Sequence, residues 1–159
     1  MNKTISIIMI TFAFQMTCLA AHGQSLTVAD LIRLSVLSQQ EATQFISSAK
    51  HFKVLKPLVN NGITISQYSK EGVMQSELVL KSEFQDPKGS VHSSLNYDFK
   101  PPMYVNGIIS QLKTLGFTLL SKQSDTNKQV WVFDNGRYAV SIHAFGEALL
   151  PANVEIHSK

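Results

Sequence analysis

Apolar and polar residues alternate with a period of two through three successive segments, and this alternation is what most constrains the fold. The segments cover about residues 63–68, 74–81 and 91–99. Two sequences rich in turn-forming residues separate them, Lys70-Glu71-Gly72 and Asp86-Pro-Lys-Gly89. Successive side chains of a strand point to opposite faces, and Gly, Pro and Asp favour tight turns. The pattern predicts an antiparallel meander with one apolar and one mostly polar face.

Helical patterns flank this meander. Thr27-Val-Ala-Asp30 and Ser38-Gln-Gln-Glu41 have the spacing of capping boxes, and apolar residues follow at helical intervals. We therefore expect two linked helices over about 28–37 and 39–50. Pro101-Pro102 precedes a third helical pattern, with apolar residues at 105, 108, 109, 112 and 115 and a terminating Gly116. Short strands are then expected at 117–120, 129–133, 137–145 and 153–157, with a turn at 134–136.

The two parts of the chain have similar patterns, which indicates an internal repeat over 28–100 and 101–159. The helical patterns, the glycine turns at Gly72 and Gly136, and the terminal Phe84 and Phe145 are offset by 61–64 residues. A unit of about 60 residues with one helix buries little apolar surface by itself. We therefore predict an α+β domain in which two α-β-β-β(-β) units share one antiparallel sheet of six to eight strands. Helices would cover one face and leave the other open.

The N-terminal 24 residues have the pattern of a secretory signal peptide. Lys3 provides a positive start, residues 5–21 are uncharged and mostly apolar, and small residues follow. Cleavage is expected after Gly23 or Gln24, which would leave one domain over 25–159. An uncleaved N-terminal anchor is the alternative. Cys18 raises the further alternative of lipid attachment, although the residues before it depart from a lipobox.

Composition excludes several classes of protein. The single Cys rules out an internal disulfide framework and a cysteine-rich zinc module. The net charge of +3 falls to +2 without Lys3, so nucleic-acid binding is not expected. Lysines at 50, 53, 56, 70, 81 and 88 are dispersed, as is typical of a solvated surface. Phosphate-binding loops, zinc-protease motifs and nucleophile elbows are absent from the sequence, and no cofactor is predicted.

Histidines and carboxylates form the one candidate for chemistry. If Ile142, Val154 and Ile156 point to the core, His143, Glu155 and His157 face the open side, where two histidines and a carboxylate could hold a metal. The alternative is an ordinary solvated polar face. Glu77 and His92 are expected on the equivalent face of the first half.

Aromatic residues suggest a second use of the open face. Trp131 and Phe133 lie in a strand that is apolar on both sides. They could reach the open face and form a recognition patch with Tyr68 and Phe145. In the alternative, this strand is central and covered on both sides. The candidate binding residues are therefore Tyr68, Glu77, Trp131, Phe133 and His143.

The leader ending in Gly-Gln and the Leu115-Gly116-Phe117 helix end resemble features of small, uncharacterised exported proteins of Bacteroidota. The doubled helix-and-sheet plan is similar, in architecture alone, to that of the beta-lactamase inhibitor protein. These resemblances imply an exported, non-enzymatic binding protein of the periplasm or exterior, with a protein or glycan of the cell envelope as its partner. A small metal-dependent hydrolase and a structural envelope component are the alternatives.

Overall fold

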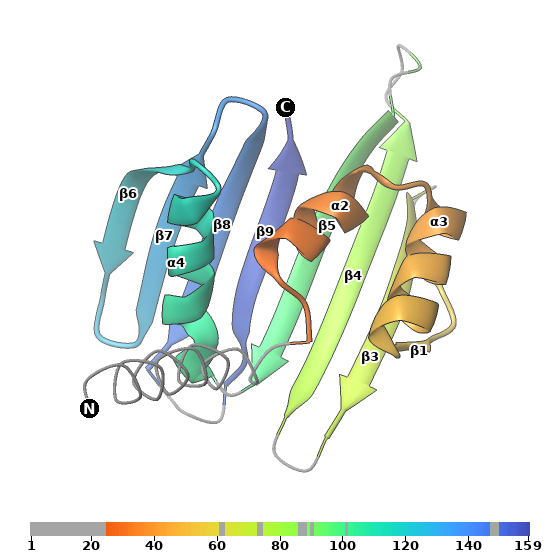
Figure 1. The fold of residues 1–159 in the computed structure, drawn as a ribbon, viewed down its shortest axis with the longest axis horizontal. Coiled ribbons are helices and arrows are strands. Elements are labelled where there is room, and N and C mark those ends of the chain that lie inside the picture. Colours follow the sequence, from red (N-terminus) through yellow and green to blue (C-terminus); the bar gives the residue numbers. More distant parts are fainter. Residues whose placement is uncertain are drawn as a thin grey trace, which may run out of the picture.

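The chain forms one antiparallel sheet with helices on a single face (Figure 1). The computed structural model describes residues 25–60, 63–72, 75–85, 89, 91–100, 102–146 and 150–159. Three parts of the prediction lie outside the described residues: the leader, Met74, and residues 86–88 of the second turn, which include Lys88. The predicted α+β class is confirmed, and the described residues form nine strands in place of the expected six to eight.

The elements follow the predicted order closely. The helices are α2 (Val28–Val36), α3 (Gln39–Gln44) and α4 (Val105–Thr114), with a π-helical turn η1 (Phe45–Ala49) and a 3₁₀ turn η2 (Pro102–Tyr104). The first strands are β1 (Lys53–Val54), β2 (Leu58–Asn60), β3 (Ile63–Glu71), β4 (Ser76–Gln85) and β5 (Val91–Lys100). After α4 come β6 (Thr118–Ser124), β7 (Lys128–Asp134), β8 (Tyr138–Phe145) and β9 (Ala152–Ser158).

Two hairpin series meet at the centre of the sheet. The strand order is β1-β3-β4-β5-β9-β8-β7-β6, and β2 also pairs with β3. The last strand of each half therefore pairs with that of the other, through an antiparallel β5–β9 ladder running from Ser94↔His157 to Phe99↔Ala152. In both halves a helical segment precedes the antiparallel strands. An internal repeat in the sequence stays a prediction.

Local capping interactions fix the helix ends. The Thr27 and Ser38 side chains accept from the backbone N–H groups of Asp30 and Glu41, and each acidic side chain accepts from the cap backbone in return. These are the two predicted capping boxes. At the end of α4, Gly116 has a φ of +80° and the Phe117 N–H donates to the Leu112 carbonyl. The predicted glycine cap is thus a Schellman turn.

Three helical segments and one sheet face enclose the core. From α2, Leu31 and Leu34 are fully buried, as are Ile108 (about 1% exposed) and Leu112 from α4. The sheet contributes one residue in two from its central strands: Val79, Leu95, Tyr97, Phe99, Phe133, Val140, Ile142, Ala152, Val154 and Ile156. Because α2 lies across β5 and β9 (Figure 1), it covers the junction of the two halves.

The first hairpin differs from its prediction. Lys70 and Glu71 continue β3, and the Gly72 N–H donates to the Gln75 carbonyl, so all three residues of the predicted turn extend the ladder. Gly72 also lacks the positive φ that a turn glycine was expected to have, unlike Gly136 in the β7–β8 turn, whose φ is +85°. The glycine of the predicted turn therefore lies at the end of the β3–β4 ladder, where it hydrogen-bonds with Gln75.

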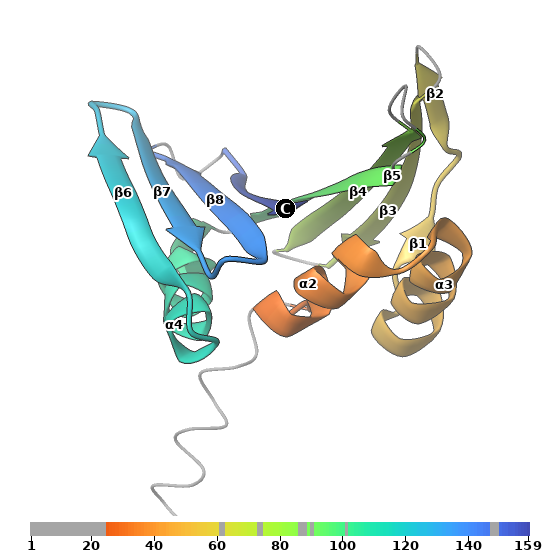
Figure 2. The same ribbon diagram turned by 90° about the horizontal axis from the view of Figure 1, so that it is seen from above.

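The helix-free face of the sheet is concave. Figure 2 shows β3–β4 on one side and β6–β8 on the other bending away from the helices, with β5 and β9 between them. Strand twist accumulates in this way across an antiparallel sheet of many strands. We refer to this helix-free surface as the open face. Within the described residues, none of the helices is long and apolar enough to cross a membrane.

We predict that replacing Leu34 by Ala will lower the free energy of unfolding by about 2–5 kcal/mol, because the truncation leaves a cavity between α2 and the β5–β9 junction. Urea denaturation measures the effect. Val36 lies on the same helix but is 58% exposed, so Val36→Ala is the matched control and should change stability by less than about 0.5 kcal/mol. Equal losses in both variants would contradict the assignment of the buried helix face.

Candidate functional site

Polar side chains cover the middle of the open face. The alternating positions of β5, β9 and β8 bring Ser94, Asn96, Asp98, Asn153, Glu155, His157, Ser141 and His143 to this side. The Asn153 amide donates to the Asp98 carboxylate at 2.7 Å. This polar floor lies at the bottom of the concavity, where a bound partner would meet several hydrogen-bonding groups.

The predicted metal trio does reach the open face, but it does not converge. His157 Nε2 and Glu155 Oε2 are 3.9 Å apart, whereas His143 pairs in register with Asn153 on β9. Within the described part of the chain, no group of three His, Cys, Asp or Glu side chains could hold a metal ion. The sequence predicted the correct face for all three residues. Their positions along β8 and β9, however, keep the three side chains from meeting at one point. The metal-dependent hydrolase thereby loses its candidate centre.

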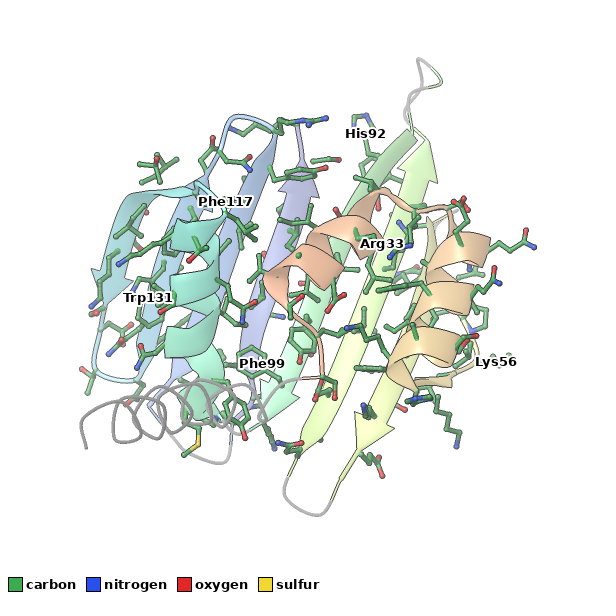
Figure 3. All side chains as sticks on the ribbon, in the orientation of Figure 1. Arg33, Lys56, His92, Phe99, Phe117 and Trp131 are labelled. Atoms are coloured by element: carbon green, nitrogen blue, oxygen red, sulfur yellow. The ribbon has the colours of Figure 1, made fainter. Side chains whose placement is uncertain are left out.

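The predicted aromatic patch is wrong. Tyr68, Trp131 and Phe133 point to the helix-covered face and are at most 9% exposed. Trp131 lies beside α4 (Figure 3), with the Lys122 ammonium 5.5 Å from its ring. β7 is apolar on both faces, and α4 covers the face that carries its aromatics. Phe145 does occupy the open face, at the end of β8, where the Lys128 ammonium approaches its ring.

Glu77 also lies on the opposite face from the one predicted. It is 4% exposed and is directed into the helix-covered layer, where its carboxylate accepts from the Tyr97 hydroxyl at 2.7 Å and the Ser25 backbone N–H at 3.1 Å. Burial, reinforced by the negative charge of Glu77, raises the pKa of Tyr97 far above its usual value. Tyr97 therefore stays a neutral donor to this carboxylate. His92 does face the open side, as expected, and stacks on Phe84.

An apolar strip on the open face was missed by the sequence interpretation. Because Glu77, Val79 and Lys81 point to the helices, Leu78 and Leu80 point to the open side. They join Ile63 and Ile65 of β3, and all four side chains are half-buried. We call these four residues the apolar strip. Leu78 and Leu80 are as apolar as Val79, so alternation alone did not tell which set of β4 residues faces the core.

A groove lies beside the strip. Its volume is about 550 Å³, and it extends over β1, β3, β4 and β5. Leu55, Leu78 and Pro151 form apolar parts of its lining. Two lysines and three acidic residues line it as well: Lys53, Lys100, Glu71, Glu77 and Asp98. The groove therefore combines apolar contact area with charges of both signs. We call it the β3–β5 groove.

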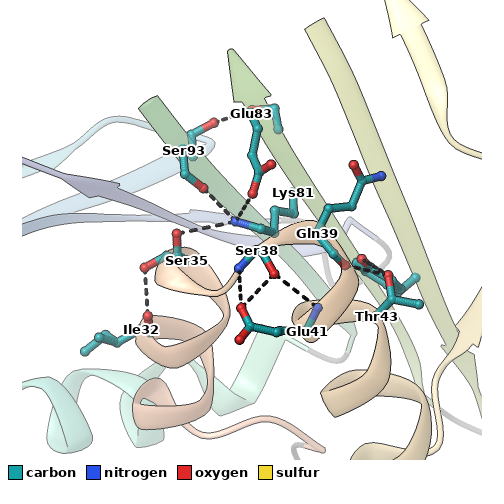
Figure 4. Close-up of polar contacts among 12 residues, drawn as sticks. Ile32, Ser35, Ser38, Gln39, Glu41, Thr43, Lys81, Glu83 and Ser93 are labelled. Carbon is teal, nitrogen blue, oxygen red and sulfur yellow. Dashed lines mark hydrogen bonds and ion pairs between the residues drawn. The ribbon is translucent and has the colours of Figure 1, made fainter. Parts of the chain in front are cut away.

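A buried lysine forms a connected polar cluster beneath the helices. Lys81 is 2% exposed, and its ammonium lies 2.8 Å from Ser93 Oγ, 3.0 Å from Glu83 Oε1 and 3.4 Å from the Ser35 carbonyl oxygen (Figure 4). The prediction of a merely solvating surface lysine is wrong for this residue. Its three N–H groups meet three acceptors, which fixes the end of α2 on β4 and β5.

This cluster has the residue types of a serine–lysine pair but lacks the arrangement that such catalysis requires. A lysine that activates a serine must accept the hydroxyl proton and so must present a free lone pair. Lys81 is instead an ammonium paired with Glu83, with Ser93 accepting one of its hydrogen bonds. The cluster is a structural ion pair.

Other lysines have similar structural roles. Lys50 pairs with Asp30 at 2.7 Å and links α2 to the end of η1. Burial opposes ionisation of Asp30, but the hydrogen bonds from Lys50 and Thr27 outweigh it and lower the pKa of Asp30. Lys70 donates to the Lys50 carbonyl, and its ammonium lies over Phe52. These contacts hold the elements of the first half together.

Comparison with protein-family models, curated proteins and solved structures finds no match to the chain.

We predict that Glu83→Gln will lower the free energy of unfolding by about 1–3 kcal/mol, because it leaves the buried Lys81 ammonium without its counterion. Adding Lys81→Met should recover most of this loss, since the double variant buries no charge. Urea denaturation compares the variants.

Glu155→Gln on the open face is the control, and it should change stability by less than about 0.5 kcal/mol. If Lys81→Met worsens the loss in the Glu83→Gln background, the ion-pair interpretation is contradicted.

Proposed function

We propose that this is an exported, non-enzymatic binding protein that recognises a partner protein of the cell envelope through its open face. The observation that carries the proposal is the β3–β5 groove next to the apolar strip, on a concave face that none of the described helices covers. Apolar area surrounded by polar groups is typical of surfaces that bind other proteins. The polar floor would supply hydrogen bonds at the centre of the contact.

The chemistry of the groove favours a protein segment over a glycan. A neutral sugar chain can hydrogen-bond to Lys53, Lys100, Glu71 and Asp98 but offers them no opposite charge, whereas a polypeptide can present both charges and an apolar anchor. The buried position of Tyr68, Trp131 and Phe133 also removes the aromatic platform that was expected on this face. The pair Leu55 and Leu78 offers aliphatic contact to a protein side chain.

Export is part of the same proposal. The pattern of residues 1–24 supports a leader that directs the chain across a membrane, and residues 25–159 would form the mature binding protein. The similar element order of the two halves supports an origin by duplication. In this account the duplication yields a sheet wide enough to form a concave surface.

We predict that a photo-crosslinker attached at Leu80→Cys on the open face will capture a partner from an envelope fraction of the producing organism. The same probe at Thr114→Cys on the exposed side of α4 is the matched control and should not capture that partner. Mass spectrometry identifies the adduct, and its affinity is then measured with purified components.

In that measurement Leu78→Arg should weaken binding more than tenfold, because the groove loses an apolar anchor and gains a charge. Thr114→Arg should leave affinity unchanged. Equal capture from both probe positions, a glycan adduct, or unchanged affinity of a folded Leu78→Arg variant would contradict the proposal.

A further inference from the structure

The most deeply buried carboxylate of the described residues has no cationic partner among them. Glu77 is 4% exposed. Two other carboxylates on the helix side of the sheet each pair with a lysine: Asp30 with Lys50 and Glu83 with Lys81. Lys70 is the cross-strand neighbour of Glu77, but its ammonium binds the Lys50 carbonyl instead. A buried charge without a counterion is costly, so this exception calls for an explanation.

One donor to Glu77 occupies a special position in the sequence. The backbone nitrogen of Ser25 lies 3.1 Å from Glu77 Oε1. Ser25 is the residue that follows Gln24, the second of the two predicted cleavage positions. Cleavage between Gln24 and Ser25 would convert this nitrogen from an amide to a primary ammonium. An α-amino group has a pKa near 8, so it carries a positive charge at neutral pH.

The neighbouring residues fix this nitrogen in place. Leu26 is fully buried, and Thr27 is the N-cap of α2. Leu26 and Leu31 occupy the positions of a hydrophobic staple, and both are fully buried. These contacts hold the Ser25 nitrogen against Glu77 without any contribution from the residues before Ser25. Tyr97 accompanies it as the second donor, at 2.7 Å from Glu77 Oε2.

We propose that Glu77 is a binding site for the N-terminal ammonium of the mature chain, which cleavage between Gln24 and Ser25 creates. Hydrolysis of that peptide bond consumes one water and yields the carboxylate of Gln24 and the amine of Ser25. The new ammonium then forms a buried ion pair with Glu77 and ties the start of the mature chain to β4 and β5. The inference rests on the proposed leader, and it is independent of what the open face binds.

Two forms of the domain test the ion pair. One begins at Ser25, released from a cleavable fusion, and the other keeps Gly23 and Gln24 as an extension. We expect the form that begins at Ser25 to melt about 5 °C higher, because the extension replaces a charged partner of Glu77 with an amide. Glu77→Gln should reduce this difference to less than about 1 °C, whereas the control Glu155→Gln should preserve it.

Acetylation of the Ser25 amine in the native background gives a comparison that does not depend on how well the Glu77→Gln variant folds. It should lower the melting temperature as the extension does. Equal melting temperatures of the acetylated and free forms would overturn the ion pair, as would a difference that persists in Glu77→Gln.

The cleavage position is tested by the intact mass of protein expressed with its own leader and recovered after export. We expect the mass of residues 25–159 with a free amine. Pyroglutamate at Gln24, or a chain that keeps the leader, would overturn the assignment.

Discussion

The antiparallel pairing of β5 with β9 is the interaction on which the rest of the structure depends. Each half ends in one of these strands, so their ladder converts two small hairpin series into one sheet. It brings Leu95 and Tyr97 beside Ile156 and Val154 under α2, and all four side chains are fully buried. Neither half would bury enough apolar surface by itself. The same ladder places the polar floor at the centre of the concave face, so the candidate surface depends on both halves.

Buried charge, as much as apolar area, decides which side of β4 faces the helices. Glu77 and Lys81 lie on the same side as Val79, and each finds partners there: Tyr97 and Ser25 for the carboxylate, Ser93 and Glu83 for the ammonium. Satisfied polar networks in a core specify one arrangement, because any shift leaves a group unpaired. One consequence is that the leucines of β4 face outward, which supplies the open face with its apolar strip.

Much of the fold could be predicted from local patterns, whereas the candidate site could not. Capping at Thr27, Ser38 and Gly116, and alternation in β5, β8 and β9, depend on nearby residues, and the structure agrees with them. The faces of Trp131 and Glu77 depend on what covers each side of a strand, and nothing within the strand records this. The groove likewise combines residues distant in sequence, such as Lys53 and Lys100. The sequence did predict that His143 lies on the open face, because apolar and polar residues alternate regularly along β8.

Single-cysteine labelling along β5 and β9 tests the central claim most directly, since the one native cysteine, Cys18, lies in the proposed leader. Cysteines at Asn96 and Glu155 should react with a maleimide at least about 100-fold faster than cysteines at the neighbouring Leu95 and Val154. This alternation follows from one shared sheet with one covered and one open face. Comparable protection of both sets, or comparable reactivity of both, would show that the two halves do not join beneath the helices in this way.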